Sequence, residues 1–192
     1  MVVERDTLRA SPTVDQLFKD VTGRITGDVE RGDVDWSNEL TAHVLELKTA
    51  KPTADIPGFR AKFAAEVRAI NALLAKRGLM LLPTAAHPLF DPFTETVLWP
   101  HDHHEVYELY NRIFDCRGHG WSNLQSVHLN LPFANDEEFG KLHTAIRLLL
   151  PIIPALSASS PLLDGKPTGF LDARMEAYLH HQERLPQLMG SL

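Results

Sequence analysis

The chain has very little cysteine and no long apolar run. Cys116 is the single cysteine in 192 residues, so no disulfide can form within the chain, which suits a reducing compartment. The longest apolar stretch, Leu148 to Leu156, contains Pro151 and Pro154 and is too short to cross a bilayer. The start, Met-Val-Val-Glu-Arg-Asp, lacks the apolar stretch of a signal peptide. We therefore expect a soluble cytoplasmic protein with no membrane partner.

The chain also lacks a basic block and several nucleotide-binding and hydrolase motifs. Lys and Arg number 19 against 25 Asp and Glu, which gives a net charge of −6 and argues against a nucleic-acid partner. No GxxxxGK[ST] or GxGxxG pattern is present, so neither a P-loop nor a dinucleotide-binding fold has support. A GxSxG pattern is missing too, which disfavours an α/β-hydrolase.

Hydrophobic residues make up 44% of the sequence, enough for a sizeable core in one domain spanning residues 1–192. Apolar spacing and end signals predict helices over 13–21, 57–77, 103–114, 135–150 and 172–184. Strands are predicted within 35–49 and over 79–82 and 124–131. Strands separated by helices of unequal length favour an α+β fold over a regular doubly wound sheet.

The segment from Gln125 to Pro132 alternates strictly between apolar and polar residues. Side chains alternate along a strand, so two sets form: Val127, Leu129 and Leu131 on one face, and Ser126, His128 and Asn130 on the other. The apolar set is expected in the core. The polar set could be the solvated face of an antiparallel sheet, or it could present an imidazole and an amide to a ligand.

A second predicted strand carries a carboxylate. Leu45 and Leu47 share one face, and Glu46 and Lys48 share the other. Glu46 beside His128 would form a hard-oxygen site for magnesium, which prefers one or two carboxylates together with substrate phosphates. The alternative is that Glu46 and Lys48 are simply exposed strand residues. We expect Glu46, His128 and Asn130 to converge on one concave face of a mainly antiparallel sheet.

The run from His101 to Glu105 resembles a zinc site only at first sight. Asp102 and Glu105 have the spacing of a capping box that opens a helix at His103, and adjacent histidines point in different directions. No Cys pair or HExxH motif accompanies them. We therefore expect His101, His103 and His104 to point outward, and a metal-dependent hydrolase around them is the weaker reading.

Cys116 and His119 lie in a glycine-rich segment and could form a thiol–imidazole pair. The alternative is that Cys116 is a small buried apolar residue, which is the usual state of a lone cysteine.

Several segments together resemble the type-2 glutamate–cysteine ligase family of carboxylate–amine ligases, from Val2 to about Pro186. The segments that carry the resemblance are Ser37–Leu40, Glu46–Thr49, Leu82–Thr84 with His87-Pro88, Gly118–Asn130, and Ala155–Pro161 followed by Asp172, Arg174 and Tyr178. Each segment alone is weak evidence, whereas their combination is specific.

The resemblance implies a glutamine-synthetase-like fold, with a mainly antiparallel sheet and helices packed on one face. It also implies ATP and Mg²⁺ as cofactors, small-molecule substrates (a glutamate-like carboxylate and an amine) and a homo-oligomer. By position in the family's motifs, Glu46 and His128 are expected at the metal, and His128 and Asn130 at the nucleotide. Gln125 and Arg174 are expected as catalytic residues that contact substrate.

The sequence departs from the family pattern at both ends. Family members begin with a Gly-Val-Glu-x-Glu strand and continue with further strands after the position of Leu192. We therefore expect an incomplete portion of a larger ligase catalytic domain, with apolar surface or sheet edges left uncovered, which would favour self-association. The competing reading is a non-catalytic binding or structural remnant of the same fold.

We predict that the 192-residue chain binds ATP–magnesium weakly and shows no measurable ligation. One strand carboxylate with a neutral imidazole and an amide offers little to offset the charge of several phosphates. The measurement is ATP hydrolysis that depends on both glutamate and an amine, made on this chain and on a version extended at both ends. Equal turnover by the two versions would show that the site is complete as it stands.

Overall fold

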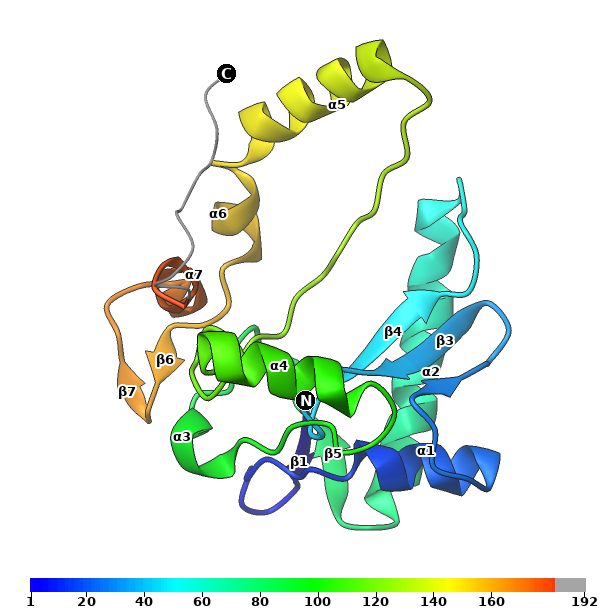
Figure 1. Ribbon diagram of the computed structural model, residues 1–192, viewed down its shortest axis with the longest axis vertical. Coiled ribbons are helices and arrows are strands. Elements are labelled where there is room, and N and C mark those ends of the chain that lie inside the picture. Colours follow the sequence, from blue (N-terminus) through cyan, green and yellow to red (C-terminus); the bar gives the residue numbers. More distant parts are fainter. Residues whose placement is uncertain (182–192) are drawn as a thin grey trace.

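The computed structural model describes residues 1–181 and shows an α+β fold, as the sequence predicts. A body contains the elements from β1 to α4, and an arm of residues 126–157 leaves it, carries α5 and α6, and returns (Figure 1). The elements β6, β7 and α7 lie where the chain comes back to the body.

The described part of the chain contains seven short strands and seven helices. The strands are β1 (Val2–Glu4), β2 (Asp28–Val29), β3 (Val34–Asn38), β4 (Leu45–Thr49), β5 (Leu79–Leu81), β6 (Leu162–Leu163) and β7 (Lys166–Pro167). The helices are α1 (Val14–Thr22), α2 (Ile56–Ala75), α3 (Pro92–Glu95), α4 (His104–Phe114), α5 (Asp136–Leu149), α6 (Ile153–Ser157) and α7 (Ala173–Leu179). All strand pairs are antiparallel: β1 with β5, β6 with β7, and β3 between β2 and β4.

The sequence predicts one or two strands within residues 35–49, and the structure has two, the antiparallel pair β3–β4. Trp36 lies opposite Leu47, and Ser37 lies opposite Glu46. Because side chains alternate along each strand, Trp36 and Leu47 face the core while Ser37 and Glu46 share the other face.

Three aromatic rings form the centre of the core. Phe18 of α1 lies 6.4 Å from the ring of Trp36 and 6.3 Å from the ring of Trp99, centroid to centroid. All three side chains are completely buried, and Ile70 and Leu74 of α2 pack beside them. Each buried aliphatic side chain of this size contributes roughly 1.5–3 kcal/mol. The core thus joins α1, the β2–β3–β4 sheet and the second half of α2.

Helix α2 ends at Ala75, two residues before the predicted end at Arg77, and the predicted stop at Gly78 closes the turn that follows. Gly78 has φ 71°, a left-handed conformation that costs a glycine little. The turn directs the chain into β5, whose residues Leu79 and Leu81 lie opposite Glu4 and Val2 of β1.

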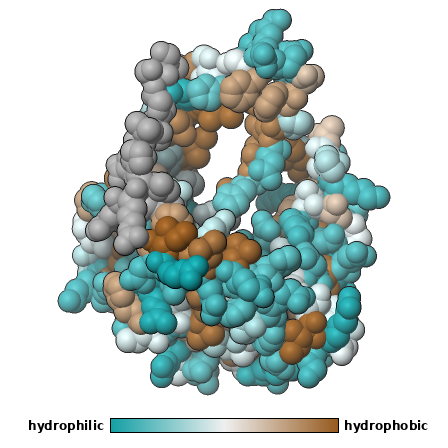
Figure 2. All heavy atoms as spheres, in the orientation of Figure 1, coloured by the Kyte–Doolittle hydropathy of each residue, from teal (hydrophilic) through white to brown (hydrophobic). Residues whose placement is uncertain are grey.

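Within residues 1–181, the arm packs little against the rest of the chain. None of the residues of α5 is buried, and the helix is separated from the body in Figure 1. Its predicted N-terminal cap is confirmed, because the Asn135 side chain accepts a hydrogen bond from the Glu138 N–H at 3.0 Å. Figure 2 shows apolar surface on the arm and an opening between arm and body. Apolar side chains of the arm are thus exposed within residues 1–181.

The predicted strand over residues 124–131 is not formed within the described part of the chain. The segment is extended, but it pairs with no described strand, and Val127 and Leu129 are 98% and 64% exposed. The prediction that these residues face the core is therefore wrong for the described chain. A strand requires a neighbour for its N–H and C=O groups, and alternation alone does not supply one.

Two predictions about helix ends are also corrected. Helix α4 begins at His104, and its cap residue His103 is left-handed (φ 69°) with no side-chain capping bond, so Asp102 does not cap it. The last helix, α7, ends at Leu179, and residues 182–184 of the prediction lie outside the described residues. Among residues 1–181, no helix is both long and apolar enough to span a membrane.

His43 is a buried histidine of the body. The Nε2 atom of His43 lies 3.0 Å from the carbonyl oxygen of Ser122, so it carries the hydrogen, while Nδ1 has no partner among the described residues. Burial lowers the pKa of His43 from 6.5 to about 4, because water cannot solvate the imidazolium. The nearby His87 has its pKa lowered by the same cause.

We predict that acid destabilises the fold through His43. Its pKa is lower in the folded chain than in the unfolded chain, so the unfolded state binds more protons between pH 6.5 and about 4. The stabilisation present above pH 6.5 is lost across this window, by up to about 3 kcal/mol for a pKa lowered from 6.5 to about 4. Urea unfolding measured from pH 7 to pH 4 tests this.

The matched variant is His43→Gln, whose amide can still donate to the Ser122 carbonyl but does not titrate. Its free energy of unfolding should vary less with pH over the same window. An unchanged pH dependence in His43→Gln would contradict the assignment to this imidazole.

Candidate functional site

Two carboxylates lie close together at the end of the central sheet. Glu39 directly follows β3, and Glu46 is on β4. Burial raises the pKa of Glu39, the charge of Glu46 raises it further, and His128 and Lys48 act to lower it. The charges of Glu46, Lys48 and His128 thus each act on the carboxyl group of Glu39.

The sheet holds Glu46 in place. The Ser37 hydroxyl donates to Oε2 of Glu46 across the β3–β4 pair at 3.1 Å, and Ser37 is itself buried. Lys48 is two residues further along β4, and its Nζ lies 2.7 Å from Oδ1 of Asp28 on β2. A rigid strand pair thus presents one oriented carboxylate and one partly neutralised ammonium group.

Helix α4 closes one side of this site. The Asn38 side chain donates to the Tyr107 hydroxyl at 3.0 Å and to the Glu39 carbonyl oxygen at 3.1 Å. Burial raises the pKa of Tyr107, and the bond from Asn38 acts against that rise. Tyr107 therefore keeps its proton and fixes α4 against the end of β3.

Glu39 is the residue that the sequence reasoning missed. It lies in the Ser37–Leu40 segment of the family resemblance, but it follows the strand and so has no place in the alternation used to select Glu46. The sequence did contain a signal for Glu39. It is a carboxylate at the end of a strand, and a second carboxylate lies on the next strand of the same hairpin.

His128 and Asn130 lie on the exposed extended segment of the arm. The charges of His128 and Glu46 both act on the pKa of Glu39, but the segment that carries His128 and Asn130 belongs to no sheet within residues 1–181, so the predicted convergence on one sheet face is not found there. No hydrogen bond joins Asn130 to Glu39 or Glu46 within residues 1–181. The assignments of Glu46 and His128 to metal, and of His128 and Asn130 to nucleotide, stay predictions.

Gln125 and Arg174 are joined by a hydrogen bond, and we call this pair of residues the clasp. The side chain of Gln125 accepts from the Met1 amine at 2.5 Å and donates to the Thr84 carbonyl at 2.6 Å. Arg174 donates from Nη1 to the Gln125 carbonyl at 3.0 Å. Both ends of the Gln125 side chain are occupied, so the observed role is structural, and their substrate contact stays a prediction.

The clasp extends into the segment around Ser160. Its hydroxyl donates to Oδ1 of Asp172 at 2.7 Å, and Nε of Arg174 lies 3.7 Å from the same oxygen. The combination of this serine with Asp172 and Arg174 contributes to the family resemblance. In this structure it closes the base of the arm.

The thiol–imidazole pair is not present. Burial raises the pKa of Cys116 to about 11, so the thiol stays protonated. The imidazole of His119 is engaged on both sides, with Nε2 3.0 Å from Oδ1 of Asp164 and Nδ1 accepting from Asn123 at 2.9 Å. Cys116 is a small buried apolar residue, which was the alternative reading.

The histidines of the 101–104 run have separate partners. His101 lies 2.9 Å from Oδ2 of Asp15 in α1, and His104 lies 3.6 Å from Oε2 of Glu108. Within residues 1–181, no group of three or more His, Cys, Asp or Glu side chains is placed to hold a metal ion. The structure thus gives the hydrolase reading no metal-binding cluster among these residues.

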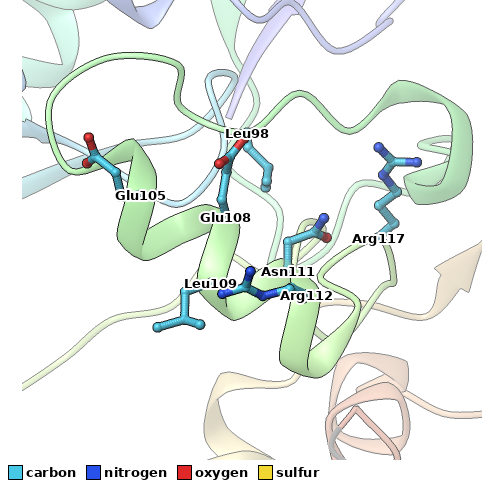
Figure 3. Close-up of a pocket in the computed structure, with 7 residues that line it drawn as sticks. All are labelled: Leu98, Glu105, Glu108, Leu109, Asn111, Arg112 and Arg117. Atoms are coloured by element: carbon cyan, nitrogen blue, oxygen red, sulfur yellow. The ribbon is translucent and has the colours of Figure 1, made fainter.

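A hollow of about 480 Å³ lies along α4 (Figure 3). Its lining residues are Leu98, Glu105, Glu108, Leu109, Asn111, Arg112 and Arg117. None of the residues predicted for catalysis, metal or nucleotide lines this hollow. It therefore adds nothing to the case for the carboxylate site.

Comparison with known proteins gives a consistent result. The sequence profile of glutamate–cysteine ligase family 2 matches residues 2–191. A protein of Archaeoglobus fulgidus, named only as uncharacterized, is 33% identical over 181 residues, which cover 94% of this chain and 48% of that protein. A protein of Cronobacter sakazakii with the provisional name glutamate–cysteine ligase 2 is 27% identical over 150 residues, 78% of this chain and 38% of that protein. The chain spans about half or less of the length of these curated relatives.

We predict that the charge of Glu46 helps to keep the pKa of Glu39 above its ordinary value. Glu46→Gln removes that charge and should lower the pKa of Glu39, as followed by carbon-13 NMR of the carboxyl groups during a pH titration. Glu30→Gln removes an exposed carboxylate that is not among the causes of the shift and should leave the pKa unchanged. An equal pKa of Glu39 in both variants would show that the two carboxylates are not coupled.

Proposed function

The chain belongs to glutamate–cysteine ligase family 2, and on that premise we propose that it supplies part of an ATP- and Mg²⁺-dependent carboxylate–amine ligase. In the proposed reaction the γ-phosphoryl group of ATP passes to a glutamate-like carboxylate. An amine then attacks the acyl phosphate and releases phosphate. An anionic donor must meet an anionic acceptor, so the site has to offset negative charge and position both substrates.

The observation that carries this proposal is the coupled pair Glu39 and Glu46. Two carboxylates in a partly buried place repel each other, and a bound cation relieves that repulsion. Magnesium usually takes one or two carboxylates and completes its shell with water and phosphate oxygens, which fits this donor set. Magnesium held there would neutralise charge on the phosphates of ATP.

The other residues of the site have supporting roles in the proposal. Ser37 keeps one oxygen of Glu46 oriented, and the Asn38–Tyr107 bond holds α4 beside Glu39. The charge of His128 acts on the pKa of Glu39, but His128 does not form a metal-binding group with Glu39 and Glu46 within residues 1–181. In the proposal His128 and Asn130 would therefore reach the metal and the nucleotide only if the arm moves closer to the two carboxylates. Gln125 and Arg174 would contact substrate only if their present bonds open.

The alternative from another class is a non-catalytic remnant that keeps the fold for binding or assembly. Two observations favour this alternative. Gln125 and Arg174 already make hydrogen bonds within the chain, and no residue of α5 on the arm is buried. The two readings differ in one measurable property, namely ATP consumption that depends on a carboxylate substrate.

We predict that the version extended at both ends forms a hydroxamate from glutamate in an ATP-dependent reaction, with hydroxylamine as a small amine that captures the acyl phosphate. Glu46→Gln should lower this rate at limiting magnesium by roughly 10- to 100-fold, because the metal loses a ligand. The assay is run on the 192-residue chain and on the version extended at both ends, so that the outcome does not depend on how much of the family's length is present.

Glu30→Gln is the matched control, since it removes one exposed carboxylate outside the site and should keep the full rate. Binding of ATP with no carboxylate-dependent turnover in either version would instead favour the remnant. Equal rates for Glu46→Gln and Glu30→Gln would remove Glu46 from the metal site.

A further inference from the structure

Residues 160–172 form a closed loop, which we call the strap. It contains the β6–β7 hairpin, and its two ends are joined by the Ser160–Asp172 bridge, where the serine hydroxyl lies 2.7 Å from Oδ1 of the aspartate (Figure 1). The hairpin turn consists of Asp164 and Gly165, which are both left-handed, with φ 51° and 71°. Asp-Gly is a preferred sequence for a two-residue hairpin turn, so local residues determine the shape of the strap. The strap can therefore move as one unit.

Two hydrogen bonds hold the tip of the strap against the body. The Gly165 N–H donates to the Pro88 carbonyl at 2.8 Å. Nε2 of His119 lies 3.0 Å from Oδ1 of Asp164, and we call this contact the tether. The His119 side chain is mostly buried, whereas the Asp164 side chain is largely exposed. The tether thus connects the strap to the segment that precedes the arm.

A neighbouring amide determines which nitrogen of His119 carries the hydrogen. Asn123 accepts from the His87 N–H and donates to the His87 carbonyl, so its side chain cannot turn over without losing two buried bonds. The NH₂ group of Asn123 therefore faces Nδ1 of His119, at 2.9 Å, and Nδ1 is the acceptor. The hydrogen is then on Nε2, which donates to the Asp164 carboxylate. A donor facing a carboxylate makes a charge-assisted bond, which is stronger than a bond between neutral groups.

The other end of the strap carries polar atoms that lack partners. Nε of Arg174 and Oδ2 of Asp172 are buried and make no hydrogen bond to a described residue. Nε lies 3.7 Å from Oδ1 of Asp172, which is beyond hydrogen-bond distance. Because both atoms are already enclosed, further chain packed on the outside cannot pair them unless the strap moves. A buried polar atom without a partner costs free energy, so contacts elsewhere in the strap have to offset this cost.

The strap is not packed closely against α7. A hollow of about 270 Å³ lies between them. It is lined by strap residues such as Leu163 and Phe170 and by α7 residues such as Ala173 and Ala177. A displacement of the strap therefore does not have to compress a close-packed interior.

We propose that the strap is a latch, which the tether closes, and that the closed latch keeps Arg174 bonded to Gln125. Release of the tether frees the guanidinium of Arg174 to bind a carboxylate. In the closed state Nη1 is occupied by the Gln125 carbonyl and Nε is buried. In the open state Nε and the Nη groups are available together, and this edge of a guanidinium binds a carboxylate through two parallel hydrogen bonds. Use of the freed Arg174 by a substrate rests on the proposed function, whereas the latch does not.

The test is the rate at which phenylglyoxal modifies Arg174, followed by mass spectrometry of the peptides. Asp164→Gly removes the carboxylate but keeps a residue that adopts φ 51° at little cost, so the hairpin turn is retained. Labelling of Arg174 should become roughly 5-fold faster, the equilibrium change that corresponds to one net hydrogen bond. Asp164→Asn is the matched control, because it keeps the turn and an oxygen acceptor, and it should raise the rate less. Arg60, exposed on α2, is the internal reference for general unfolding.

Variants of His119 test the tether from its other side and leave the turn unaltered. A glutamine amide reaches the position of the imidazole Nε2 and can donate to Asp164, whereas an asparagine amide reaches only the position of Nδ1. Labelling of Arg174 should therefore be faster in His119→Asn than in His119→Gln. Circular dichroism establishes that each variant is folded.

Glutamate is the carboxylate probe. It should slow the labelling of Arg174 in Asp164→Gly and leave that of Arg60 unchanged. Equal labelling of Arg174 in Asp164→Gly and the unaltered chain overturns the latch, as does an equal rise at Arg60. So does an effect that occurs in the 192-residue chain and is lost in the version extended at both ends. Absence of protection by glutamate overturns the carboxylate assignment. These measurements need neither ATP nor turnover, so their failure is distinct from failure of the proposed ligase reaction.

Discussion

The buried amide of Asn123 and the amide of Gln125 join parts of the chain that are distant in sequence. Asn123 accepts from the His87 N–H at 2.7 Å and donates to the His87 carbonyl at 3.0 Å, as a neighbouring strand would. It also donates to His119, and Gln125 is bonded to Arg174 through its carbonyl. These amides are withdrawn from water, so losing one would leave buried polar groups without partners, at roughly 1–3 kcal/mol each. The arm begins directly after this junction, and its direction depends on it.

The junction explains why the candidate site is divided between two structural environments. Glu39 and Glu46 belong to the packed body, where Ser37 and the core beneath β3 hold them. His128 belongs to the arm and is exposed among the described residues, yet its charge still acts on the pKa of Glu39. In the family-length relatives the same residues would sit among about twice as much chain. The carboxylates are therefore the preorganised part of the site, and the imidazole is the adjustable part.

The most reliable predictions from the sequence concern features that depend only on residues close to one another in the chain. The Gly78 turn after α2 and the Asn135 cap of α5 depend on bonds within a few residues, and both are found as predicted. The strand over 124–131 has an equally clear pattern, but a strand also depends on a partner elsewhere, which no local pattern specifies. The cap by Asp102 failed because His103 turns left-handed and moves the helix start. Glu39 was missed because its closeness to Glu46 arises only when the hairpin forms.

Among the described residues little packs against α5, so local interactions contribute much of the stability of this helix. Three acidic residues occupy its first turn, Arg147 lies in its last, and Lys141 pairs with Glu137 one turn away at 2.6 Å. These are local stabilisers of an isolated helix, and a helix of 14 residues is near the lower limit for such independence in water. An uncovered α5 would therefore lose its helical structure gradually on warming, while the body unfolds in one cooperative step. One melting temperature cannot describe both processes, and calorimetric and helix-sensitive spectroscopic transitions would separate for as long as α5 stays uncovered.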